Sequence, residues 1–167
     1  DINGAFVAAT RAIAVTSGGG SIDFSSTING GSQNLTITSG AGAVGVGGAI
    51  TSTGNLTIGS DGGAGAITLS GNIGTDAAAG AAVVIIGNAA TASLTLAGVE
   101  YTTSDAATYT ANSFALTGTD ITFQSSNDNI GFVDGATGGI VLSDAADLTI
   151  STELGGAGGG NISIAPS

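Results

Sequence analysis

The sequence predicts an all-β fold, a right-handed parallel β-helix (β-solenoid) with about 22 residues per coil. Three observations predict it: apolar–x–apolar pairs recur at one period, turn-forming residues fill the intervals, and no single unit is large enough to enclose a core. At this period the 167 residues make roughly seven or eight coils. The handedness follows from the general rule for parallel crossover connections.

Three registers of apolar residues advance together along the first half of the chain. Equivalent members lie 21 to 23 residues apart in every register. The registers hold Ile13/Val15, Leu35/Ile37 and Leu56/Ile58; then Ile22/Phe24, Val44/Val46 and Ile67/Leu69; and then Ile28, Ile50 and Ile73. Because residues i and i+2 of a strand face the same side, Leu35 and Ile37 point inward while Thr36 points outward.

The inward-facing members of these strands form the predicted core. The residues expected in it are Ile22, Phe24, Leu35, Ile37, Val44, Val46, Leu56, Ile58, Ile67 and Leu69. Gly, Ser and Asn between the strands are the residue types that turns require. Asn34 and Asn55 stand directly before equivalent strands, and we expect their side chains to stack as a ladder.

The period is less regular after Ile73, although strand-like apolar pairs continue. The segment Gly98–Ser113 breaks the rhythm and contains both tyrosines of the chain, Tyr101 and Tyr109. We expect it to be an irregular insertion, such as a short hairpin, or a widened coil, in a single solenoid that spans residues 1–167. Two aromatic rings on such a segment would be platforms on which a ligand stacks.

The two ends of the chain, when joined, resemble an interior stretch. Residues 158–167 followed by 1–5 read GGGNISIAPS-DINGA, and Gly18–Gly31 reads GGGSIDFSSTINGG. The joined sequence has one extra residue before the shared Ile-Asn-Gly. Neither end resembles the polar cap that ordinarily covers a solenoid. We therefore expect one period of a longer tandem array, or a subunit that stacks end to end.

The charge of the chain limits its partners. Twelve acidic residues accompany a single cation, Arg11, for a net charge of −11. Nucleic acid binding needs a basic face that displaces counterions, which one arginine does not provide. No apolar run approaches the roughly 18–20 residues of a membrane-spanning helix. The expected partners are copies of the chain itself and cell-surface glycans, with no nucleic acid and no membrane insertion.

The sequence does not indicate an enzyme. It has no His, Cys or Lys for a nucleophilic device, and it lacks the usual ligands of zinc. Paired carboxylates are the one device left for cleaving glycosides. The candidates are Asp120 with an acid one coil away, or Asp144 with Asp147.

Calcium is the one cofactor for which the sequence offers ligands, because this ion prefers oxygen. The stretch Ser125–Gly135 is rich in Asn and Asp. Its candidate calcium ligands are Asp128 and Asp134. Asn and Asp in solenoid turns are more often plain turn formers, and loose screening by cations between stacked, like-charged rods is favoured over a specific site.

Three stretches resemble the repeats of filamentous haemagglutinin-like adhesins, which are large secreted bacterial β-helix proteins. They are Gly20–Gly40 (GSIDFSSTINGGSQNLTITSG), Thr53–Gly74 (TGNLTIGSDGGAGAITLSGNIG) and Thr117–Phe132 (TGTDITFQSSNDNIGF). The resemblance implies an extracellular or cell-surface location and a structural, shaft-like role in adhesion or in a biofilm matrix. It transfers no catalytic residue to this chain.

The expected function is therefore a structural unit of an extracellular bacterial fibre or giant adhesin shaft that stacks through open β-helix ends. Ladder hydrogen bonds and stacked Ile, Leu and Val rows would make such a rod stiff. The alternative is a carbohydrate- or host-binding adhesin module that uses the segment Gly98–Ser113.

Overall fold

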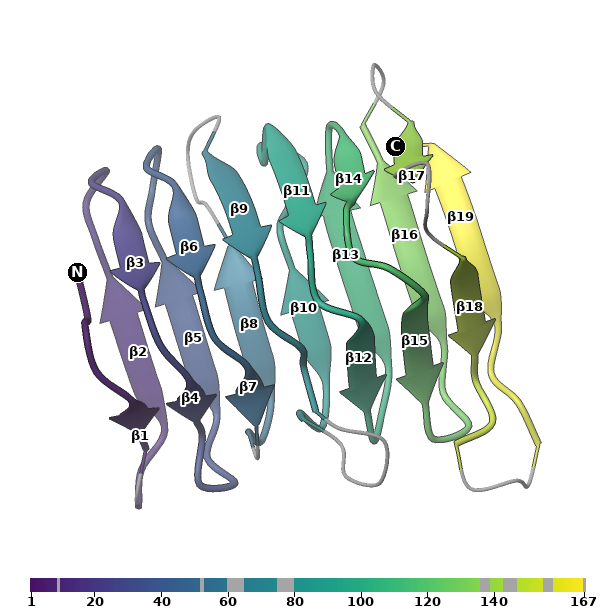
Figure 1. The fold of residues 1–167 in the computed structure, drawn as a ribbon, viewed down its shortest axis with the longest axis horizontal. Helices are drawn as coiled ribbons and strands as arrows, with labels where there is room; N and C mark the ends of the chain where they lie inside the picture. Colours follow the sequence, from purple (N-terminus) through teal and green to yellow (C-terminus); the bar gives the residue numbers. More distant parts are fainter. Residues whose placement is uncertain are drawn as a thin grey trace.

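The computed structural model describes residues 1–8, 10–51, 53–59, 65–74, 80–135, 139–142, 147–154 and 158–166. In these residues the chain winds as a β-solenoid with three faces (Figure 1). Each strand pairs in parallel with the equivalent strand of the next coil, so the predicted fold class is confirmed. The described residues include no helix that is long and apolar enough to cross a membrane.

The three faces, here called A, B and C, are visited in turn by every coil. Face A contains β3 (Ile22–Phe24), β6 (Val44–Val46), β9 (Ala66–Leu69), β11 (Ser93–Leu96), β14 (Phe114–Leu116) and β17 (Ile140–Leu142). Face B contains β1 (Phe6–Val7), β4 (Ile28–Asn29), β7 (Ile50–Thr51), β12 (Glu100–Thr103), β15 (Ile121–Ser125) and β18 (Leu148–Ser151). Face C contains β2 (Ile13–Thr16), β5 (Leu35–Thr38), β8 (Leu56–Gly59), β10 (Val84–Ile86), β13 (Ala107–Ala111), β16 (Ile130–Asp134) and β19 (Ile162–Pro166). Ile73 joins the two halves of face B, because it bridges both Ile50 and Tyr101.

Successive coils lie about 23 residues apart and make about six turns. The predicted period is therefore close, and the predicted number of coils is slightly high. One reason is a long step in the middle of the rod, where 28 residues separate Leu56 from its ladder partner Val84. Figure 1 shows the chain rising along the rear face and descending along the front as it advances from the N-terminal end, which is a right-handed winding.

The core is a set of columns in which each inward-facing residue lies on its equivalent one coil away. All ten residues expected in the core are buried, and the most exposed of them, Ile22, is only 8 % exposed. On face C, Leu35 pairs with Leu56 and Ile37 pairs with Ile58, as the common period requires. Since one coil encloses no core alone, the stability of the rod comes from this repeated burial between neighbouring coils.

The segment Gly98–Ser113 is not an irregular insertion, and that expectation was wrong. It contains β12 and β13, of which β13 pairs with both β10 and β16. Tyr109 lies in the same column as Ile86 and Phe132. The rhythm is hidden in the sequence because aromatic residues replace aliphatic ones here and because a longer connection precedes the segment.

Asparagine side chains link coils at the corner between faces B and C. Asn34 Oδ1 accepts a hydrogen bond from the backbone N–H of Asn55 at 2.8 Å. Asn129 Oδ1 accepts the equivalent bond from Asn161 at 2.7 Å. Near both ends of the rod, an asparagine side chain thus bonds to the backbone of the asparagine one coil on, whereas the middle coils have valine or alanine at this position.

Glycines form a column at the corner between faces A and B. Its members are Gly48, Gly71, Gly98 and Gly118. A Cβ atom on Gly98 would lie 2.6 Å from the carbonyl oxygen of Gly71 and 2.9 Å from Asn72 Oδ1. The backbones of neighbouring coils thus approach too closely here for any residue larger than glycine.

Candidate functional site

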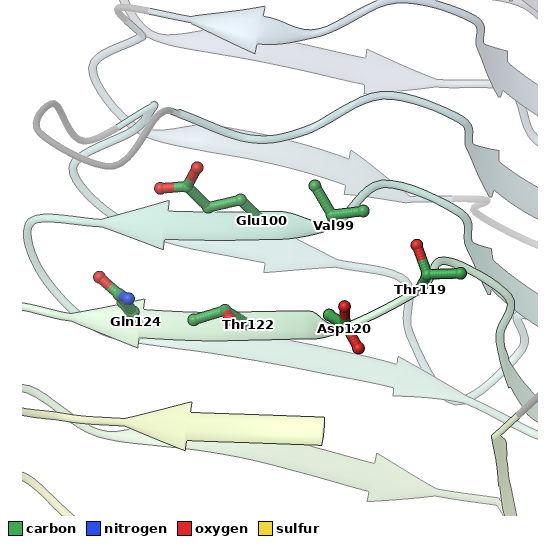
Figure 2. Close-up of a pocket in the computed structure, with 6 residues that line it drawn as sticks. All are labelled: Val99, Glu100, Thr119, Asp120, Thr122 and Gln124. Atoms are coloured by element: carbon green, nitrogen blue, oxygen red, sulfur yellow. The ribbon is translucent and has the colours of Figure 1, made fainter. Parts of the chain in front are cut away.

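A groove of about 340 Å³ lies on face B, over the neighbouring strands β12 and β15 (Figure 2). It is lined by Val99, Glu100, Thr119, Asp120, Thr122 and Gln124. Glu100 and Thr122 are ladder partners on adjacent coils. Because Tyr101 and Phe123, the next residues along the two strands, point into the core, the alternation of a strand turns Glu100 and Thr122 outward. The groove is therefore predominantly polar.

Glu100 is the most enclosed of the lining residues, since it is only 8 % exposed although it faces away from the core. Its Oε1 accepts a hydrogen bond from the hydroxyl of Thr102 at 2.9 Å. The backbone N–H groups of Val99 and Glu100 donate to Asn72 Oδ1 of the preceding coil, at 2.8 and 3.2 Å. These bonds hold the beginning of β12 in place and with it the carboxylate.

Asp120 lies at the other strand of the groove, directly before β15, with a left-handed φ of 53°. The sequence paired it with an unidentified acid one coil away, and the structure brings Glu100 to the same groove. Figure 2 shows the two carboxylates pointing in different directions. Of the second candidate pair, Asp144 lies outside the described residues, whereas Asp147 is described and exposed.

The two tyrosines do not form stacking platforms, which corrects that expectation. Tyr101 and Tyr109 are each only 1 % exposed. Tyr101 stacks on Phe123 with a centroid distance of 4.8 Å, and Tyr109 stacks on Phe132 at 5.1 Å. The Tyr101 hydroxyl accepts a hydrogen bond from the N–H of Gly98, and burial raises the pKa of both phenols above its usual value. Ile73, Tyr101 and Phe123 occupy one column, but the step of 28 residues from Ile73 to Tyr101 hid this register in the sequence.

The candidate calcium ligands Asp128 and Asp134 do not meet. They flank β16, with Asp128 two residues before the strand and Asp134 at its end. At about 3.3 Å per residue, the strand Ile130–Asp134 alone spans about 13 Å, which is too far for two ligands of one ion. Asp134 Oδ2 instead accepts a hydrogen bond from the N–H of Gly139 at 2.8 Å. Within the described parts of the chain, no group of three acidic residues is placed to hold a metal.

The C-terminal end of the rod exposes residues of the core columns. Ile164 is 61 % exposed, whereas Phe132, directly beneath it in the same column, is 1 % exposed. A largely apolar hollow of about 390 Å³ lies at this end, lined by Asp134, Gly139, Ile140, Leu142, Leu148, Ile164 and Ala165. At the other end, Ile13 and Val15 of β2 are half-buried and pack against the core on one side only. Each end thus presents strand edges and apolar side chains together.

The register of the two ends differs from the one that the joined sequence suggested. Ile162 was matched with Ile22 of face A, but it pairs with Ile130 of face C. Ile2 was matched with Ile28 of face B, but it bridges Phe24 of face A. The joined sequence therefore does not place Ile162 and Ile2 on the faces that its likeness to Gly18–Gly31 indicated.

The fold defines the class of the protein, a parallel β-solenoid, and its composition is acidic. Comparison with known proteins matches it to no family model, no curated protein and no solved structure.

Proposed function

We propose that this chain is a structural unit of an extracellular bacterial fibre or giant adhesin shaft, in which rods stack end to end. The observation that supports this function most directly is the exposure of core-column residues at the C-terminal end. Ile162 and Ile164 are 49 % and 61 % exposed, although Ile130 and Phe132 one coil below are each 1 % exposed. Another coil on this end would bury them and complete the unpaired strand edges.

The mechanical role follows from the direction of the ladders. All three faces carry strand-to-strand hydrogen bonds along the axis of the rod, which is the direction in which a shaft bears load. The acidic surface, with a net charge of −11, keeps rods apart side by side and favours contact through their ends. The resemblance of the repeats to filamentous haemagglutinin-like adhesins supports the extracellular bacterial setting.

Cryo-electron microscopy of the purified chain, in calcium and in chelator, tests this function. We expect filaments of the rod's own width with an axial repeat of about 4.8 Å. Filaments that dissolve in chelator would make calcium a part of the joint, and filaments that persist would exclude that role. Discrete rods with no end-to-end contact at any concentration or ionic strength would contradict the fibre unit.

A second candidate function, a carbohydrate-binding adhesin module, is supported by the groove of Figure 2. It uses Val99 and Glu100 of the segment Gly98–Ser113, together with residues of β15. Carboxylate, amide and hydroxyl groups suit the hydroxyl groups of a sugar, and two carboxylates disfavour acidic glycans. The ligand class is therefore neutral or amino-sugar oligosaccharides.

Glycan titration distinguishes this second function. Gln124→Ala removes an amide from the groove, and Thr108→Ala removes an outward hydroxyl from β13 outside it. We expect the first change to weaken glycan binding roughly tenfold, about the loss of one hydrogen bond to a buried partner, and the second to leave it unchanged. Equal affinity of both variants would contradict a glycan site in this groove.

A further inference from the structure

The geometry points to a directional joint between two copies of this chain, in which Arg11 of one copy lies against Glu153 and Asp128 of the next. This inference rests on the proposed end-to-end stacking and specifies its polarity, its register and its charged contact. The partner is a second copy of the same chain, placed head to tail.

The first argument is the phase of the faces at the two ends. The described chain begins on face A, where Ile2 bridges Phe24, and then forms β1 on face B and β2 on face C. It ends with β17 on face A, β18 on face B and β19 on face C. A second copy placed on the C-terminal end therefore continues the order A, B, C without a rotation that would mismatch the faces. If the C-terminal ends of two copies met instead, the strands of the two copies would run in opposite directions.

The second argument is the register on face C. Ile13 and Ile162 both begin strands of this face and both belong to the same inward column. A head-to-tail copy thus pairs Ile162 with Ile13 and Ile164 with Val15, and it covers the exposed side chains of β19 with those of β2. In this register Ser163 of the first copy would pair with Ala14 of the second copy, and both side chains would face outward.

The third argument is charge at the corner between faces B and C. Arg11, the one cation of the sequence, is exposed and stands two residues before β2. Gly160 and Asp128 hold the same position before β19 and β16. Arg11 of the second copy would lie one strand spacing, about 4.8 Å, beyond Gly160.

Gly160 leaves this position open to the carboxylates around it. It has no side chain, and a Cβ atom there would be 2.7 Å from the backbone N of Asn129, so it lies directly over the turn that contains Asp128. The Oε1 of Glu153 lies 3.5 Å from the position of a Cβ on the adjacent Gly159. Glu153, which is exposed, and Asp128, which is half-buried, thus lie next to the position that Arg11 of the second copy would take.

The Asn column supports the same register. Asn129 accepts the N–H of Asn161, as Asn34 accepts that of Asn55. Asn161 is exposed at the top of its column, and Ala12 is the residue of a second copy that would stand above it. Its side-chain oxygen is placed to accept the backbone N–H of Ala12, which repeats the bond that the column already makes twice.

Cysteine cross-linking tests the register, because the natural chain has no cysteine. The variant Ala14→Cys/Ser163→Cys places the two thiols on paired positions, within the Cα separation that a disulfide spans. Six strand spacings, about 29 Å, separate them within one copy, which prevents an internal bond. Under a mild oxidant we expect a ladder of covalent dimers, trimers and longer species. Thr16→Cys/Ser163→Cys, two residues out of register on the same face, is the control and should cross-link at least about tenfold more slowly.

Sedimentation velocity of charge variants tests the contact at Arg11. Arg11→Gln and Thr108→Glu each make the net charge more negative by one, but only the first lies at an end. We expect Arg11→Gln to weaken end-to-end association about threefold to tenfold and Thr108→Glu to have a smaller effect. Arg11→Glu should weaken it further, and adding Glu153→Arg to that variant should restore it.

The outcomes separate this joint from the proposed function. Filaments that form without a cross-link between positions 14 and 163 would contradict the joint but not the proposed function. Equal weakening of association by Arg11→Gln and Thr108→Glu would have the same meaning. Rods that remain single in every condition would overturn both. A ladder together with rescue by the reversed charge pair is the result expected for the joint.

Discussion

Replacement of Ile58 with aspartate is expected to unfold the solenoid. Ile58 is completely buried, with ladder partners Ile37 on one side and Ile86 on the other. A carboxylate at this position would have neither water nor a cation around it, and burial of an unpaired charge costs about 4–5 kcal/mol or more. That loss approaches the whole stability of an ordinary domain. The measurement is the free energy of unfolding in denaturant, followed by circular dichroism.

Thr57→Asp is the matched control for this change. Thr57 is the preceding residue of the same strand and faces outward, between Thr36 and Ile85. The aspartate at position 57 adds the same negative charge in the same coil but leaves that charge in water. We therefore expect a loss of less than about 1 kcal/mol in the free energy of unfolding. A folded Ile58→Asp rod with the stability of the control would show that the assignment of inward and outward residues is wrong.

Replacement of Gly98 with alanine is expected to destabilise the rod by about 1–3 kcal/mol. The added methyl group would lie 2.6 Å from the carbonyl oxygen and 2.7 Å from the carbonyl carbon of Gly71. Backbone atoms of a neighbouring coil cannot move aside as a flexible side chain does, so the two coils must separate locally. The N–H of Gly98 also donates to the Tyr101 hydroxyl at 2.9 Å, and the same displacement would weaken that bond.

Gly131→Ala provides the comparison. Gly131 lies outward on β16, and a Cβ atom there meets no other atom within 4 Å. Removing a glycine from an unstrained strand reduces the entropy of the unfolded chain, so we expect a gain of about 0.5 kcal/mol. Thermal and denaturant unfolding of the two variants should therefore shift in opposite directions. Equal stability of the two would mean that the coils tolerate a wider spacing at the glycine column than the structure indicates.

Strand periodicity made much of the fold predictable from the sequence. The alternation in Leu35-Thr36-Ile37 shows which side chains face inward, and its recurrence at about 22 residues shows which strands are neighbours. Both are local properties of an extended chain, so they needed no tertiary information. The ten core residues follow from them directly.

The candidate site was predictable in part. Asp120 was recognised as an acid that would meet another acid one coil away, but Glu100 could not be named, because its strand was hidden by aromatic residues and a long connection. Asp128 and Asp134 were paired because they are close in sequence. Most of the stretch between them is the extended strand Ile130–Asp134, whose ends lie about 13 Å apart.

By itself, the sequence determined the class of fold, the period of the coils and the inward-facing residues. Each of these depends on local alternation, which does not require knowledge of how distant segments meet. Only the tertiary structure decided that Tyr101 and Tyr109 belong to the core, that Glu100 and Asp120 share a groove, and that residues 162–166 lie on face C. These depend on the lengths of the connections between strands, which differ from coil to coil and which the alternation within a strand does not reveal.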